Sequence, residues 1–285
     1  MNQFHSAPTV SSKSAVLHDG VRPVWSAEVI SWLLGSPVPG HRLTVLDLGA
    51  GTGLGTRTIA ALGHAVTAVD TAKDMLSVLR KVSEELPTGI ADRITTASGS
   101  AERIPLGNES VDAIVCLQAW HWVDPDRATS ECDRVLRKNG MMGLAWHTWD
   151  RTSELVKVLA AIVEPDGKPA DQTRGVPEEF AGRASFERKD FPFNYELSVD
   201  HLVQLASSWT FVAQRSDQGA VLAKIRRLGE QAESRDTGLI RFPHITAAFR
   251  LQQLSRSECL AELFHDPEPD QRAGQAIPSQ QALTS

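Results

Sequence analysis

The segment DLGAGTG, from Asp47 to Gly53, carries the strongest indication of the fold of this chain. It ends the apolar run RLTVLDLG over 42–49, which predicts a buried parallel strand. The next run, LGTRTIAAL over 54–62, predicts a helix. Glycines at a strand-to-helix turn let the backbone approach a ligand, and the first turn of the helix presents free N–H groups there. The segment therefore predicts a ligand site at the carboxyl edge of a parallel sheet.

Strands and helices alternate on the C-terminal side of this turn. The expected strands are 65–70, 93–98, 111–117 and 141–147, and the expected helices between them are 71–86 and 125–140. Thr71 and Asp74 resemble a capping box that opens the first of these helices, and Gly140 is expected to close the second. A helix is also expected upstream, over 24–34. This order predicts an α/β fold with an open, mostly parallel sheet and helices on both faces.

The pattern changes after residue 148. Helices are expected over 151–163, 200–214 and 219–233, and strands over 186–199 and 241–254. We therefore expect a core with an N-terminal helix over 1–150, cap helices and final strands of the same sheet over 151–254, and a largely disordered tail over 255–285.

Composition excludes several classes of function. The 285 residues are 41% hydrophobic and 22% charged, which is an ordinary globular balance. The net charge is −6 and the densest basic cluster is the short KIRR at 224–227, so no nucleic-acid partner is expected. No apolar run suits a membrane span or a signal peptide, so no membrane insertion is expected. Three cysteines without CxxC spacing favour reduced thiols in the cytoplasm, and no cluster has metal-ligand spacing.

Asp70 ends the second expected strand and adds a second sign of a nucleoside ligand. A carboxylate at this position can bind both hydroxyls of an adenosine ribose, in a nicotinamide cofactor or in S-adenosylmethionine. A dinucleotide fingerprint would need Gly or Ala at position 54 or 56, where the sequence has Leu54 and Thr56. Asp47 is also unfavourable beside a pyrophosphate but suits an ammonium and a sulfonium cation. The residues therefore favour S-adenosylmethionine.

Four segments resemble class I S-adenosylmethionine-dependent methyltransferases. They are DLGAGTG, VTAVDTAKDML (66–76), SGSAERIPLGNESVDAIVCLQAWHWV (98–123) and RVLRKNGMMGLAW (134–146), in the order and spacing of that family. The resemblance implies a Rossmann-like open sheet of about seven strands with a helical cap, and S-adenosyl-L-methionine as cofactor. The cofactor-binding residues that it implies are Asp47, Gly49, Ala50, Gly51, Gly53, Asp70, Thr71, Met75, Ser100, Ala101, Glu102, Gln118 and Ala119.

Two further segments point to a subgroup. GVRPVWSAEVISWLL (20–34) and QAWHW (118–122) are similar to segments of the trans-aconitate methyltransferase-like group and of small-molecule methyltransferases of quinone type. The sequence departs from the group at Ser100, where Asp is common, and at Trp25, where Tyr is usual. The likeness implies a small-molecule methyl acceptor. The acceptor-side residues that we expect are Arg22, Trp25, Trp120, Trp122 and His147.

Methyl transfer from a sulfonium is an in-line displacement that depends mainly on alignment and exclusion of water. A carboxylate acceptor needs no base, whereas a phenol, an amine or a carbon acid can need one. His121 is the candidate catalytic base, and the alternative is that it only holds its loop through the backbone. Two other functions stay open at this point: a nicotinamide-dependent oxidoreductase, and a non-catalytic protein on a methyltransferase scaffold. The sequence leaves the acceptor and the oligomeric state open.

Overall fold

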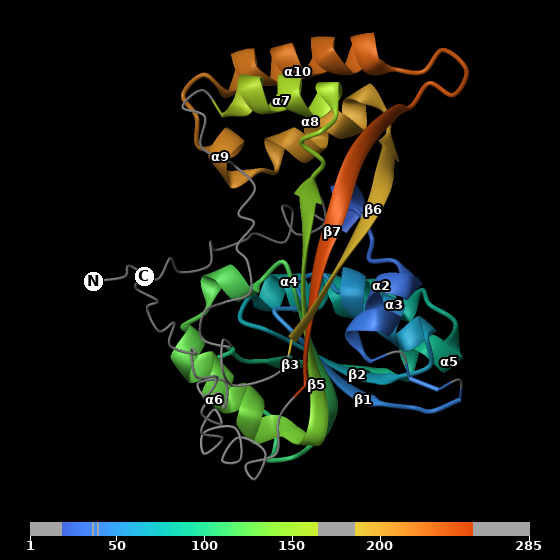
Figure 1. Cartoon of the computed structure of the whole chain (residues 1–285), viewed down its shortest axis with the longest axis vertical. Helices are drawn as coiled ribbons and strands as arrows, with labels where there is room; N and C mark the ends of the chain where they lie inside the picture. The colour runs from blue at the N-terminus through green and yellow to red at the C-terminus, as the bar shows by residue number, and fades with distance from the viewer. Residues whose placement is uncertain (1–18, 36, 39, 165–185, 253–285) are drawn as a thin grey trace, which may run out of the picture.

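The computed structural model describes residues 19–35, 37–38, 40–164 and 186–252. Their strands form one seven-stranded sheet in the order β3-β2-β1-β4-β5-β7-β6 (Figure 1). The strands are β1 (Thr44–Leu48), β2 (Ala65–Asp70), β3 (Ile94–Ser98), β4 (Val111–Leu117), β5 (Leu136–Trp149), β6 (Phe186–Leu197) and β7 (Ile240–Gln252).

The sheet is mostly parallel, as predicted. Strands β1 to β5 pair in parallel, whereas β7 runs antiparallel to both β5 and β6. The strand order reverses direction between β1 and β4, and open α/β sheets bind ligands at such a point. This topology confirms the Rossmann-like class I methyltransferase fold.

Helices cover both faces of the parallel part. They are α2 (Ala27–Leu33), α3 (Leu54–Ala61), α4 (Lys73–Glu84), α5 (Thr88–Ala91) and α6 (Pro125–Val135). Alternate residues of the strands point to opposite faces, so β1 buries Val45 with α2 and α3 and buries Leu46 with α6. The fold therefore has two apolar layers, one on each side of the sheet.

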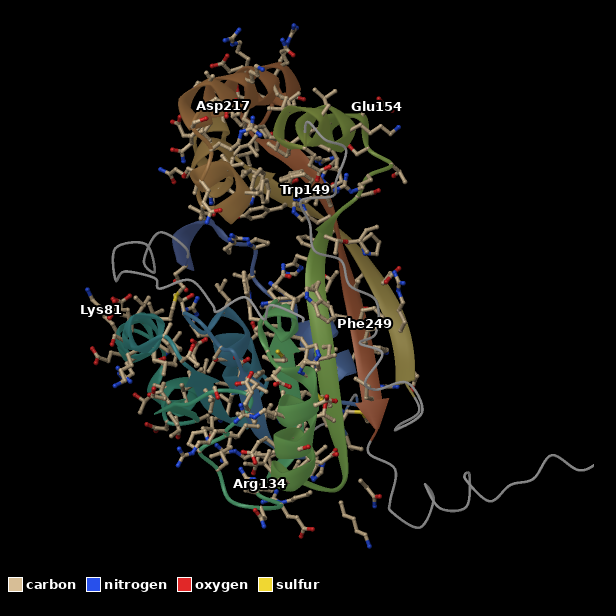
Figure 2. All side chains as sticks on the ribbon, turned by 90° about the vertical axis from the view of Figure 1, so that its left-hand side faces the viewer. Lys81, Arg134, Trp149, Glu154, Asp217 and Phe249 are labelled. Carbon is tan, nitrogen blue, oxygen red and sulfur yellow. The ribbon has the colours of Figure 1, made fainter. Side chains whose placement is uncertain are left out.

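Three long strands carry a helical cap beyond the carboxyl edge of the parallel strands (Figure 1). The cap helices are α7 (Glu154–Val163), α8 (Val199–Ser207), α9 (Thr210–Ala213) and α10 (Gln218–Ala232). They share an apolar cluster with the upper parts of β6 and β7, through side chains such as Ile225, Leu197 and Phe242. Figure 2 shows Trp149 at the level where β5 passes from the lower part into the cap. There its ring centroid lies 5.0 Å from that of Trp209 and 5.9 Å from that of Phe242.

Three predictions about local structure are wrong. The helix expected over 125–140 ends at Val135, because Leu136 has an extended ψ of 134° and begins β5. Gly140 consequently lies in β5, in an irregular stretch between the Val111–Leu136 and Ala113–Met141 pairings. The helix expected over 200–214 is divided into α8 and α9.

Thr71 does not cap α4, which is the third error. Ala72 is the N-cap residue, and its side chain cannot accept a hydrogen bond. The backbone N–H of Ala72 instead donates to Oδ1 of Asp70 at 2.7 Å. The expected capping box is therefore replaced by a contact from the last residue of β2.

Strand β6 forms the outer edge of the sheet and contains Pro192. Proline has no backbone N–H, so it is tolerated in an edge strand that pairs on one side only. The predicted tail over 255–285 lies outside the described residues. Among the helices that the structure describes, none has the length and apolar character that a membrane crossing requires.

Candidate active site

Close packing explains two of the three alternating glycines after β1. A Cβ added to Gly49 would lie 2.5 Å from the Cβ of Ala119, in the segment that follows β4. A Cβ added to Gly53 would collide with the side chain of Leu79 in α4. The loop thus packs closely against the end of β4 and against α4.

Gly51 has a different role in the same loop. Its φ is +56°, a conformation that favours glycine, and an added Cβ would have no atom within 4 Å. Its backbone N–H donates to Oδ2 of Asp70 at 2.8 Å. The loop therefore presents bare backbone beside open space and is joined directly to the end of β2.

Asp70 keeps acceptor capacity in this arrangement. Its two oxygens accept from the N–H groups of Gly51 and Ala72. A carboxylate has about four lone-pair sites, so each oxygen can accept once more. A partly exposed carboxylate held in this way fits the ribose diol of the expected cofactor.

Asp47 lies beneath the first turn of α3 and is only 1% exposed. Its Oδ2 accepts from the hydroxyl of Thr56 at 2.6 Å, while its Oδ1 is buried without a hydrogen-bond partner among the described residues. Burial raises the pKa of Asp47 to about 6; the Thr56 hydrogen bond opposes this shift and the charge of Asp70 adds to it. A buried, incompletely paired carboxylate at this loop would be stabilised by a cationic ligand nearby, so the role of Asp47 beside the cofactor stays a prediction.

The predicted adenine-side residues lie in the loop between β3 and β4. Ser100 forms an isolated antiparallel bridge with Arg103, and Ala101 is buried in the core on the α6 face. Glu102 accepts from the backbone N–H of Asp124 at 2.9 Å, which joins this loop to the start of α6. Two more of the predicted cofactor residues follow the end of β2: Thr71, next to Asp70, is exposed, and Met75 is buried in a small cluster with Val78.

Gln118 and Ala119 bring the ends of β4 and β5 together. Gln118 has a positive φ of 59°, which is uncommon for a residue with a side chain. Its backbone N–H donates to the carbonyl of Ala145, and its Nε2 donates to the carbonyl of His147 at 3.2 Å. Such a conformation persists only where the surroundings hold it, and it commonly marks a functional site.

The three rings of the Trp120–Trp122 segment, a short 3-10 helix, do not share one environment. Trp120 is 4% exposed and packs in the core on the α6 face. His121 and Trp122 are partly buried, and their ring centroids lie 4.7 Å apart. His121 and Trp122 are thus the more accessible members of the predicted group.

Trp25 and His147 meet beside the end of β5, and Arg22 is close enough for its charge to lower the pKa of His147. The rings of Trp25 and His147 are stacked, with centroids 3.8 Å apart. His147 Nδ1 contacts the Thr246 hydroxyl at 2.9 Å, and its Nε2 is buried without a partner among the described residues. Burial, with smaller contributions from His244 and Arg22, lowers the pKa of His147 to about 3, so the ring is neutral at pH 7.

The sequence reading missed the residues that β6 and β7 add to this cluster. Phe193 lies 5.0 Å from His147 and 5.3 Å from His244, between ring centroids. Tyr195, the chain's one tyrosine, donates to the carbonyl of Val21 at 3.2 Å. A period of two in 191, 193 and 195 was the available signal, because it places three rings on one face of a strand.

Comparisons with known proteins agree with this geometry. A family model described as a methyltransferase domain matches residues 46–144. An uncharacterised methyltransferase of Mycobacterium tuberculosis is 37% identical over 233 residues, which cover 80% of this chain and 89% of the relative. An uncharacterised methyltransferase-like protein of Schizosaccharomyces pombe is 33% identical over 200 residues, or 68% of this chain and 75% of the relative.

A solved structure described as a type II methyltransferase from Anaeromyxobacter dehalogenans shares the fold. Its TM-score is 0.60 at 22% identity, with 81% of this chain and 97% of that chain covered.

Proposed function

The chain belongs to the class I S-adenosylmethionine-dependent methyltransferases, and on this premise we propose that it methylates an oxygen of a small-molecule acceptor, a carboxylate or a hydroxyl, by in-line displacement. Its cofactor is S-adenosyl-L-methionine. We further propose that the cofactor lies on the core over 1–150 and that the cap over 151–254 covers the acceptor.

One observation carries the proposal: the loop that suits the cofactor adjoins the strand ends that gather acceptor-side residues. Gly49 packs on Ala119, and the preceding residue, Gln118, is bonded to the carbonyl of His147. Trp25 stacks on that same histidine. Donor and acceptor groups can therefore meet across this one edge of the sheet, as displacement requires.

The proposed roles of the side chains follow from their positions. The bound cofactor supplies a methyl group that its sulfonium already activates. Asp70 would hold the ribose, and the backbone at Gly49 and Gly51 would receive the amino-acid end. Gln118 would fix the strand end that faces the methyl group. The segment at Trp25 and the cap would exclude water, which strengthens every polar interaction inside.

His121 distinguishes the two kinds of oxygen acceptor. A carboxylate is ionised at neutral pH and needs no base, whereas a hydroxyl must lose a proton as it reacts. We propose that His121 takes this proton if the acceptor is a hydroxyl.

The test measures transfer from methyl-labelled S-adenosylmethionine to sets of carboxylic and hydroxylic compounds. We expect His121→Asn to leave carboxylate methylation unchanged and to slow hydroxyl methylation by about 100-fold, the usual contribution of a general base. Arg227 is exposed in α10, so Arg227→Gln serves as the control and should leave both activities unchanged. Label on amines or carbon alone, or on no compound of either set, would contradict the proposal.

A further inference from the structure

Residues 19–25 form a bridge between α3 and the long strands. Asp19 pairs with Arg57 of α3 at 2.9 Å, and Thr58 of α3 donates to the carbonyl of Trp25 at 3.0 Å. On the other side, the Tyr195 hydroxyl donates to the carbonyl of Val21 at 3.2 Å. Arg22 lies between these anchor points, so its position is fixed from both ends.

The guanidinium of Arg22 lacks a balancing charge. Its Nε is buried without a hydrogen-bond partner, and no ion pair joins it to a carboxylate within the described ranges. Burial lowers the pKa of Arg22, which is the direction expected of a cation without a carboxylate partner. Arginine nevertheless stays protonated in proteins, so this is a partly buried cation whose Nε is shielded from water.

The neighbouring rings are polar but uncharged at pH 7. The pKa of His147 is lowered to about 3, which leaves a neutral imidazole, and burial raises the pKa of Tyr195, which keeps a neutral phenol. Trp25 and Phe193 both pack against the ring of His147. The cluster therefore combines one fixed positive charge with flat, apolar surfaces, and burying such a charge alone is costly.

We propose that Arg22 is the receptor for a carboxylate of the methyl acceptor, whose apolar part lies against the rings of Trp25, His147 and Phe193. The inference rests on the proposed function, because it assigns the acceptor of that same reaction. A guanidinium matches a carboxylate with two parallel hydrogen bonds. A single cation balances a monoanion, whereas a phosphate dianion would leave one buried charge uncompensated.

The test uses the full chain saturated with S-adenosylhomocysteine and a broad set of aryl and alkyl carboxylic acids, each paired with its primary amide. Binding is measured by calorimetry. We expect at least one acid to bind about tenfold or more tightly than its amide, since the ion pair is desolvated. Arg22→Gln should remove this preference, Arg22→Lys should keep part of it, and Arg227→Gln should keep all of it.

Three outcomes would overturn the inference. In the first, no acid binds the wild-type protein better than its amide; in the second, Arg22→Gln keeps the preference. In the third, Arg22→Gln weakens binding of S-adenosylhomocysteine but not of 5′-methylthioadenosine, which lacks the amino-acid end, so that Arg22 would hold the cofactor carboxylate. The proposed function would survive all three results, and it fails separately if labelled methyl reaches no oxygen acceptor.

Discussion

At the scale of single residues, two aspartates at neighbouring strand ends have opposite surroundings. Asp70 is partly exposed and accepts two backbone N–H groups, whereas Asp47 is buried with one oxygen bonded to Thr56. The first arrangement stabilises a charge that a ligand can still reach. The second penalises the charge until a cation arrives or a proton binds.

Asp70→Ala tests the first arrangement. The variant loses a charged acceptor for the cofactor hydroxyls, and hydrogen bonds to charged groups contribute about 1.5–3 kcal/mol each. We expect S-adenosylhomocysteine to bind at least about tenfold more weakly, measured by calorimetry. Asp74→Ala, an exposed carboxylate in the first turn of α4, is the matched control. Equal affinity of wild type and Asp70→Ala would show that the ribose lies elsewhere.

Asp47 should make the stability of the cofactor-free protein depend on pH. Its pKa rises from 3.8 to about 6 on folding, so between these values the folded state binds more protons than the unfolded state. The free energy of unfolding therefore falls as pH rises through this window, and the protonated form is favoured below it. The shift corresponds to about 2 kcal/mol between pH 7.5 and pH 4.5.

Asp47→Asn removes this titration and keeps the size of the side chain. We expect the difference in unfolding free energy between wild type and variant to change by about 2 kcal/mol between pH 7.5 and pH 4.5. Denaturant titrations at a series of pH values measure this difference. Asp74→Asn should follow the wild type. A constant difference for Asp47→Asn at every pH would rule out a buried titrating carboxylate at this position.

At the scale of elements, strong periodicity and glycine spacing made most of the fold predictable. The seven strands and the helices α3, α6, α7 and α10 lie where the sequence placed them, apart from their ends. The error at the end of α6 occurs where local signals agree with a helix but strand pairing determines the structure. The segment from Arg137 to Gly140 has the basic residues and terminal glycine of a helix end, yet Leu136 pairs with Val111 and starts β5.

The cofactor side of the candidate site carries a stronger sequence signal than the acceptor side. Gly51 and Asp70 carry their signal in type and spacing, because a loop of bare backbone needs glycine and a ribose needs a carboxylate. The cluster of Phe193, Tyr195 and His244 has a weaker signal, because the alternation in β6 places the two rings on one face but does not show that they meet His244. It depends on the antiparallel register of β6 and β7, in which Phe193 pairs with His244, and pairing over this sequence distance cannot be read from one strand.

Gly49→Ala tests the packing of the glycine loop against the end of β4. The added methyl would overlap Ala119 at a backbone φ of +73°. Overpacking costs about 1–3 kcal/mol and the left-handed conformation about 1–2 kcal/mol. We expect a loss of about 3 kcal/mol in unfolding free energy by denaturant titration. Gly63→Ala, with a positive φ but no neighbour within 4 Å, should lose only the strain component.

The double variant Gly49→Ala with Ala119→Gly isolates the contact itself. Removing the Ala119 methyl should restore about 1–2 kcal/mol of the loss, which a double-mutant cycle measures as coupling. Additive effects of the two substitutions would mean that the two Cβ positions do not meet.

At the scale of the whole molecule, the long strands β5, β6 and β7 extend from the sheet core, which holds the parallel strands, into the cap. Ile114 is fully buried in the core on the α6 face, and Ile225 is fully buried in the cap cluster. The strands that join these clusters are continuous, so we expect them to unfold together. Ile114→Ala and Ile225→Ala should each cost about 2–5 kcal/mol and shift the same transition.

The measurement compares far-UV circular dichroism with tryptophan fluorescence in denaturant. Coincident curves for the wild type and both variants are expected, since a two-state protein gives one transition by every probe. An earlier separate transition in Ile225→Ala alone would show that the cap unfolds independently.

The proline in the outermost strand affects how these molecules associate with one another at high protein concentration. A sheet whose last strand had an unbroken row of amide donors could be extended by a strand from any neighbour. Pro192 interrupts that row near the middle of β6. Each molecule thus carries its own obstacle to stacking into aggregates, independent of any ligand that it binds.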